Sequence, residues 1–141
     1  MKKIALIIPY FGTLPDYFDL WLKSVEKNPT ITFFLFTNDE SSYCYPDNIE
    51  VINIAFKDFR SRLQSEFEFE IKLESPYKLC DYKPTYGNVF KKELLQYDFW
   101  GFCDVDLIFG DIRKFITDDI LDKYDRILTR GHFSLFEIVS A

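Results

Sequence analysis

The chain contains little histidine, methionine, glycine or cysteine. Among 141 residues there are one His, one Met, five Gly and three Cys. The odd number of cysteines, Cys44, Cys80 and Cys103, argues against a disulfide framework. Their spacing lacks the Cys-x-x-Cys pattern of zinc and redox sites. We therefore expect reduced, mostly buried thiols. The scarcity of methionine and glycine favours a core filled by larger and stiffer side chains.

Excess positive charge and long apolar runs are also missing. The net charge is −6 and the sequence pI is about 4.8, so no general electrostatic attraction draws the protein to nucleic acid. The first apolar run, 4–8, stops at Pro9 and is too short for a signal peptide or a membrane span. We expect a cytoplasmic protein, free or at the inner face of the membrane, with no nucleic-acid partner.

Large apolar side chains are abundant. Hydrophobic residues make up 48% of the chain and aromatic residues 19%, with sixteen Phe and nine Tyr. This composition is that of a globular protein and excludes a disordered one. The length suits one domain, 1–141, and neither a repeat nor a linker divides it.

Continuous apolar runs alternate with helical periodicities along the chain. Runs without alternation are typical of parallel strands covered on both faces, and they predict strands at 4–8, 31–37 and 99–103. Two further short strands are predicted at 49–53 and 126–129. Helical spacing predicts helices at 16–27, with Asp16 as the N-cap, and at 56–65, 89–95, 112–115 and 118–123. The sequence therefore predicts an α/β fold with a mostly parallel sheet and helices on both faces.

The clearest candidate for a functional site follows the predicted strand 99–103. Asp104 and Asp106 come directly after it, at the end of a strand where open α/β sheets bind ligands. Residues two apart in extended chain face the same side, so both carboxylates point into one cleft. Such hard oxygen ligands suit Mg²⁺ or Mn²⁺ holding a phosphorylated substrate. The alternative is that the two side chains only cap turns or the next helix.

Other polar and aromatic residues follow neighbouring strands. Tyr10 and Phe11 lie after the first strand, and Thr37, Asn38 and Asp39 lie at the end of the second. The carboxyl ends of parallel strands lie at one edge of the sheet, which is where such sheets bind ligands. These residues can therefore hold the base and ribose of a nucleotide. Ordinary turn chemistry explains each of them equally simply.

Four further residues carry charge or a ring nitrogen. Lys83 can pair with a phosphate and Asp81 with a ribose hydroxyl or base, or the two can form a surface ion pair. His132, the single histidine, either contacts the sugar or is structural. Arg130 either binds the diphosphate or pairs with a nearby carboxylate, Asp125 or Glu137.

A family resemblance rests on four segments, which are 8–12 (IPYFG), 78–84 (KLCDYKP), 99–106 (FWGFCDVD) and 130–133 (RGHF). Over residues 3 to 136 the chain resembles a family of bacterial proteins found with polysaccharide-assembly genes. That family is similar to glycosyltransferases of the GT-A fold. The strand with its Asp-x-Asp pair and the RGHF segment are the most specific parts of the resemblance.

The resemblance implies a Rossmann-like GT-A sheet that binds a nucleotide-diphospho-sugar. Asp104 and Asp106 correspond to the pair that binds Mn²⁺ or Mg²⁺ and, through the metal, the donor diphosphate. The implied activity is sugar transfer to a polysaccharide or glycolipid, that is, to a glycan or lipid-linked acceptor. No catalytic residue is assigned, and the expected donor-binding residues are Pro9, Tyr10, Phe11, Thr37, Asn38, Asp81, Lys83, Val105, Arg130 and His132.

Members of that family are longer, and in GT-A enzymes the later half supplies the acceptor pocket and often a third metal ligand. We therefore expect a single donor-binding domain, truncated at its C-terminus. Apolar surface left uncovered by such a truncation leads us to expect a homo-oligomer or a missing C-terminal half.

Two other functions remain open. One is a catalytically inactive donor-binding fragment that keeps the fold. The other is a phosphatase of the haloacid-dehalogenase type, which also places Asp-x-Asp after an apolar strand and uses the first Asp as nucleophile. In that class the residue two positions after the second Asp is usually Thr or Val, and the motif lies near the N-terminus. In this chain that residue is Ile108, and the motif lies past residue 100.

Overall fold

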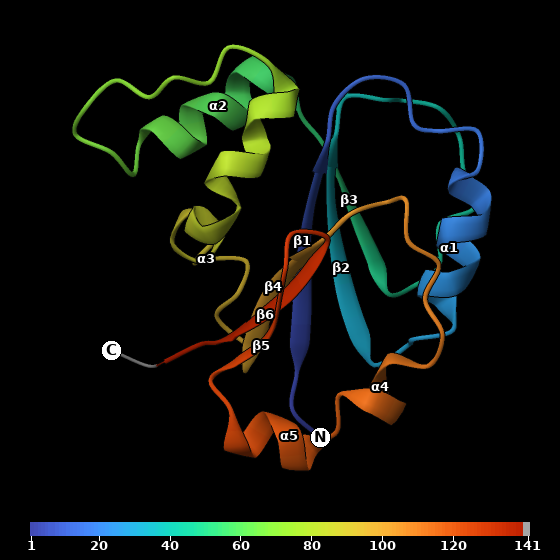
Figure 1. The fold of residues 1–141 in the computed structure, drawn as a ribbon. Coiled ribbons are helices and arrows are strands. Elements are labelled where there is room, and N and C mark those ends of the chain that lie inside the picture. The colour runs from blue at the N-terminus through green and yellow to red at the C-terminus, as the bar shows by residue number, and fades with distance from the viewer. Residues whose placement is uncertain (140–141) are drawn as a thin grey trace.

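Six strands form one mixed sheet in residues 1–139, the part of the chain that the computed structural model describes (Figure 1). Across the sheet the order is β3-β2-β1-β4-β6-β5. The strands are β1 (Ile4–Tyr10), β2 (Ile31–Thr37), β3 (Ile49–Asn53), β4 (Phe99–Cys103), β5 (Arg126–Arg130) and β6 (Phe133–Glu137).

The strands β3, β2, β1 and β4 are parallel, which confirms the predicted α/β class and the mostly parallel sheet. In register, Ile4 of β1 lies opposite Ile31 of β2 on one side and Phe99 of β4 on the other. The carboxyl ends of these strands therefore share one edge. The chain builds β1, β2 and β3 outward in one direction and then returns to place β4 on the other side of β1. The strand order thus reverses between β1 and β4.

Strand β6 is absent from the sequence prediction, which ended the sheet at 126–129. It runs antiparallel to β4 and to β5 and lies between them. Its side chains alternate between the two faces, with Phe133 and Leu135 in one core cluster and Phe136 against the other. The two residues between Arg130 and Phe133 close a tight hairpin, which is a local signal for a strand pair.

Helices cover both faces of the sheet, as expected for strands that are apolar on both sides. Figure 1 shows α1 on one side of the sheet and α2 and α3 on the other. The helices are α1 (Phe18–Glu26), α2 (Phe56–Gln64), the 3₁₀ helix η1 (Pro76–Thr85), α3 (Tyr86–Val89), α4 (Ile112–Phe115) and α5 (Asp118–Lys123). No helix in the described residues is long and apolar enough to cross a membrane.

Two helix predictions need correction. The helix predicted at 89–95 is instead the short α3, Tyr86–Val89, followed by hydrogen-bonded turns. The prediction placed Leu95 on the same apolar face as Phe90 and Leu94, but Leu95 is exposed while the other two are buried. Asp16 is not the N-cap of α1. That position is occupied by Tyr17, without a capping side-chain hydrogen bond.

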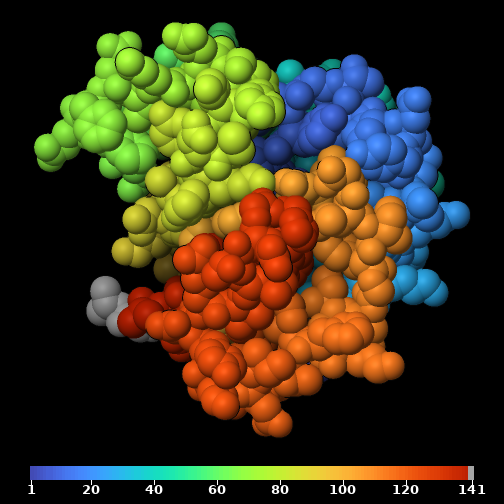
Figure 2. Space-filling model, viewed as in Figure 1, coloured from blue at the N-terminus to red at the C-terminus, as the bar shows by residue number. Residues whose placement is uncertain are grey.

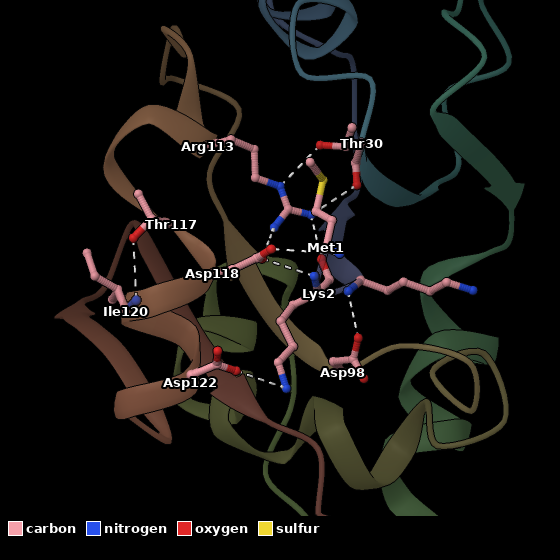
Figure 3. A network of polar contacts seen from close by, with 10 residues as sticks. Met1, Lys2, Thr30, Asp98, Arg113, Thr117, Asp118, Ile120 and Asp122 are labelled. Carbon is pink, nitrogen blue, oxygen red and sulfur yellow. Dashed lines mark hydrogen bonds and ion pairs between the residues drawn. The ribbon is translucent and has the colours of Figure 1, made fainter.

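A polar network fixes the chain before β1 to distant segments (Figure 3). The backbone N–H of Lys2 donates to Asp118 Oδ1 at 3.0 Å, and that of Lys3 donates to Asp98 Oδ2 at 2.7 Å. Arg113 donates to the carbonyl oxygen of Lys2 at 2.7 Å and to the Thr30 hydroxyl at 3.1 Å. These contacts join the amino end of β1 to α4, α5 and the segment before β4. They lie at the end of β1 opposite to its carboxyl edge.

We predict that Gly101→Ala destabilises the protein by about 2 kcal/mol or more, because a buried overpacked site cannot relax cheaply. Gly101 lies in β4, where an added methyl group would collide with the backbone carbonyl of Ser134 and lie 2.7 Å from Leu135 Cδ2. Urea denaturation followed by circular dichroism measures the change. Gly110→Ala is the matched control, since a methyl group there meets no atom within 4 Å. Equal stability of the two variants would contradict the close approach of β4 and β6.

Candidate functional site

A pocket of about 390 Å³ opens where β1 and β4 end, between the two strands at which the sheet order reverses. In α/β sheets this position is the usual ligand crevice. In Figure 2 the contributing segments, in blue, yellow-green and orange, lie next to one another on the visible face. The residues that line the pocket are Ile7, Ile8, Pro9, Tyr10, Tyr17, Pro76, Tyr77, Leu79, Cys80, Lys83, Tyr86, Phe102, Cys103, Asp104, Val105 and Asp106.

Asp104, Val105 and Asp106 form one wall of this pocket. All five residues of β4 are buried, and the chain becomes accessible only at Asp104, which is partly exposed. The Asp104 N–H donates to the carbonyl oxygen of His132 at 3.0 Å and so extends the pairing of β4 with β6. Val105 is buried in the core cluster on the α1 side, while Asp106 is exposed. Both carboxylates line the pocket, and the core contact of Val105 fixes the chain between them.

Lys83 is the positively charged side chain that lines the pocket. Its Nζ lies 2.9 Å from Asp104 Oδ1 and donates to the carbonyl oxygen of Gly131 at 2.8 Å. The same ammonium lies 5.2 Å from the centre of the Phe102 ring. The Lys83 side chain is only 19% exposed and that of Asp104 is 40% exposed, so the pair is partly shielded from water. Lys83 therefore joins η1, the end of β4 and the β5–β6 turn at one point.

Tyrosine side chains form much of the remaining lining. Tyr10 was predicted from the sequence, whereas Tyr17, Tyr77 and Tyr86 were not. Partial burial raises the pKa of Tyr17, and the carboxylate of Asp106 raises it further. The Tyr17 hydroxyl therefore stays protonated at neutral pH and can donate a hydrogen bond near Asp106. No local pattern placed Tyr17 and Tyr77 here, because their approach depends on how α1 and η1 pack.

The predicted residues after β2 have partners within the protein. Asn38 Oδ1 accepts a hydrogen bond from the N–H of Gly12 at 2.8 Å, and Asp39 Oδ2 accepts one from the N–H of Leu14 at 2.8 Å. Thr37 is fully buried, and its hydroxyl accepts from the Asp39 N–H at 3.1 Å. The side chains of Asn38 and Asp39 therefore hold the loop after β1, and Thr37, Asn38 and Asp39 do not line the pocket.

Phe11 and Asp81 also lie outside the pocket lining. The Phe11 ring packs against Phe56 and Phe59, with ring centres 5.4 and 5.3 Å apart. Asp81 is exposed, and the Cys80 thiol lies 3.7 Å from its Oδ1. Of the predicted donor-binding residues, the pocket brings together Pro9, Tyr10, Lys83 and Val105 with the carboxylate pair.

Arg130, the last residue of β5, and His132, in the β5–β6 turn, are both exposed and flank Gly131. The backbone carbonyls of both residues accept hydrogen bonds. The Arg130 carbonyl accepts from the Ser134 hydroxyl at 2.8 Å, and the His132 carbonyl accepts from the Asp104 N–H. Neither side chain is among those that line the pocket.

The donor set of the pocket fits a hard divalent cation that shares its ligands with a substrate. Residues 1–139 contain no group of three or more His, Cys, Asp and Glu side chains arranged to hold a metal. Mg²⁺ sites for phosphorylated substrates need only one or two carboxylates, because phosphate oxygens and water complete the coordination. Asp104 and Asp106 meet that requirement, although one oxygen of Asp104 contacts Lys83.

The fold and the pocket define an α/β protein with a crevice lined by both positive and negative side chains at the carboxyl edge of its parallel strands. The chain belongs to DUF6625, a family of unknown function, whose profile matches residues 6–138. The match extends from β1 to β6 and includes every residue that lines the pocket. A comparison with curated proteins found no match.

The Asp39 carboxylate predicts a pH dependence of stability. Hydrogen bonds from Ser41 and from the N–H of Leu14 lower the pKa of Asp39 below its ordinary value of 3.8. A depressed pKa contributes stability that is present above pH 3.8 and is lost as pH falls toward the lowered value. Asp39→Asn should therefore be less stable than the wild type at neutral pH. The difference should shrink below pH 3.8 in urea denaturation curves. Asp47→Asn, which removes an exposed carboxylate from the turn before β3, is the matched control. A constant difference would contradict this role.

The three thiols should react at different rates. Cys44 and Cys80 are exposed and only Cys103 is buried. The expectation of mostly buried thiols was therefore wrong, because Cys44 and Cys80 lie outside the sheet. Burial raises the pKa of the Cys103 thiol well above its ordinary value, which leaves little reactive thiolate. Titration with a chromogenic disulfide should find two fast thiols in the native protein and a third after unfolding, and Cys103→Ala should abolish only the third. Three fast thiols would contradict the buried position of Cys103.

Proposed function

We propose that this protein binds a nucleotide-diphospho-sugar and transfers its sugar to a glycan or lipid-linked acceptor, with Mn²⁺ or Mg²⁺ held by Asp104 and Asp106. One observation carries the proposal. Both carboxylates and the ammonium of Lys83 line a single pocket at the carboxyl ends of β1 and β4. A crevice at this place in an α/β sheet is where nucleotides bind in many unrelated proteins.

The charge of the protein supports a ligand that arrives with a cation. The chain carries a net charge of −6, and two carboxylates line the pocket. An anionic diphosphate is repelled by these groups unless a cation lies between them. When bound, the metal would neutralise the negative charge that develops on the departing nucleoside diphosphate.

The remaining lining supplies groups suited to the rest of such a donor. Lys83 carries three N–H donors on a flexible stem and can bind a phosphate oxygen as a point charge. Tyr10, Tyr17 and Tyr77 offer aromatic faces on which a base or a sugar ring can stack. The Tyr17 hydroxyl, protonated at neutral pH, can donate to a phosphate or sugar oxygen.

A second candidate function is donor binding without transfer. It is favoured by the absence, in residues 1–139, of a third metal-ligating side chain beside the Asp pair. The resemblance to GT-A enzymes implies that a third ligand and the acceptor pocket come from a later part of the chain in those proteins. Binding and transfer therefore have to be measured separately.

We predict metal-dependent binding of UDP- or GDP-sugars in calorimetric titrations with and without Mn²⁺. Removing both carboxylates in Asp104→Ala/Asp106→Ala should weaken binding by about a hundredfold or more, because each lost metal ligand costs about 1.5 kcal/mol or more. Asp111→Ala is the matched control, since Asp111 is an exposed carboxylate after the same strand, outside the pocket and without a capping hydrogen bond.

Release of the free nucleoside diphosphate in the presence of a glycan or lipid-linked acceptor separates transfer from binding alone. No binding of any nucleotide sugar by the wild-type protein would refute the proposal. Hydrolysis of a generic phosphate ester that is lost in Asp104→Asn would instead support the phosphatase alternative.

A further inference from the structure

The Lys83 ammonium contacts one of the two oxygens that Asp104 could offer to a metal. Its Nζ is 2.9 Å from Asp104 Oδ1, and only 19% of the Lys83 side chain is exposed. The contact is held from two other directions, by the Gly131 carbonyl at 2.8 Å and by the face of the Phe102 ring. The ion pair is therefore built into the wall of the pocket, which distinguishes it from a mobile surface pair.

A divalent cation that enters this site meets a positive charge already in place. If Lys83 stays on Asp104, the cation loses one ligand oxygen and is repelled by the ammonium. If Lys83 leaves, its charge has to find a new anionic partner, because an unpaired ammonium in a partly dry pocket is costly. In either case, binding of the cation alone is weakened.

We infer that Lys83 is an internal counter-ion that competes with the divalent cation for Asp104, so that the cation binds tightly only together with an anionic, phosphate-bearing ligand. This inference rests on the proposed function and adds to it how the two ligands depend on each other. When both ligands bind, the Lys83 ammonium would move from Asp104 Oδ1 to a phosphate oxygen and leave the Asp104 carboxylate free to hold a divalent cation.

The surroundings of Lys83 favour a short movement of this kind. Lys83 lies on η1, and Tyr77 and Cys80 of the same helix also line the pocket. The four-carbon stem allows Nζ to change partners while η1 remains in position. The Gly131 carbonyl and the Phe102 ring can keep part of the interaction with the ammonium during the exchange.

Coupled binding has a reciprocal thermodynamic signature. If a nucleoside diphosphate increases the affinity for Mn²⁺ by some factor, Mn²⁺ increases the affinity for the nucleoside diphosphate by the same factor. Any metal-bridged ligand shows such coupling. The contribution of Lys83 is distinguished by the affinity for the cation in the absence of nucleotide.

The test measures Mn²⁺ binding without nucleotide, by electron paramagnetic resonance of free Mn²⁺ and by calorimetry. Lys83→Met removes the competing charge and should bind Mn²⁺ alone about tenfold more tightly than the wild type, within the range typical of coupled sites. Lys83→Gln keeps a donor for the Gly131 carbonyl and should behave in the same way if Lys83→Met folds poorly. Lys78→Met, at an exposed position of the same helix, should match the wild type.

The same variants are then titrated with UDP at saturating Mn²⁺, where Lys83→Met and Lys83→Gln should bind about tenfold more weakly than the wild type. Unchanged or weaker Mn²⁺ binding in both Lys83 variants would overturn the inference, as would the absence of Mn²⁺ binding in all proteins. A gain in Mn²⁺ affinity in proteins that bind no nucleotide would support the competition between Lys83 and the cation for Asp104. It would overturn the part of the inference that couples cation binding to a phosphate-bearing ligand. An unchanged Mn²⁺ affinity alongside metal-dependent nucleotide binding would overturn the inference and leave the proposed function intact.

Discussion

The parallel pairing of β1 with both of its neighbours is the constraint on which the rest of the structure depends. Every residue from Ile4 to Ile8 is buried, because helices cover the sheet on both faces. Apolar burial drives this arrangement, and the parallel ladders fix its direction. As a result, the loops after β1, β2 and β4 leave the sheet at one edge. Polar groups that would be costly inside the sheet are concentrated there.

The polar groups at this edge divide into two sets with different roles. Asn38 and Asp39 accept backbone hydrogen bonds and hold the loop after β1, so their oxygens already have partners. Asp104, Asp106 and Lys83 face the pocket, where their charges are only partly balanced. A site of this kind is suited to a ligand that brings both a cation and an anion. The β5–β6 turn completes it, since the Gly131 carbonyl fixes Lys83.

The sequence alone predicted the parts of the fold that depend on local pattern. The continuous apolar runs of β1, β2 and β4 and the carboxylates that follow β4 were recognised because burial on two faces leaves a clear signature. Strand β6 was missed although the short turn before it is a local signal, because its place in the sheet depends on pairing with β4, thirty to thirty-eight positions earlier in the chain. The contact between Lys83 and Asp104 was missed for the same reason, since twenty-one positions separate the two residues. Likewise, Tyr17 and Tyr77 reach the pocket only through the packing of α1 and η1.

The central claim is that Asp104 and Asp106 bind a divalent metal together with a nucleoside diphosphate, and crystals grown with Mn²⁺ and UDP test it most directly. The account predicts one strong anomalous peak for manganese within bonding distance of both carboxylates and of the diphosphate. It also predicts that the Lys83 ammonium has moved from Asp104 to a phosphate oxygen. Manganese bound elsewhere, or a nucleotide seated away from the β1–β4 pocket, would contradict the account.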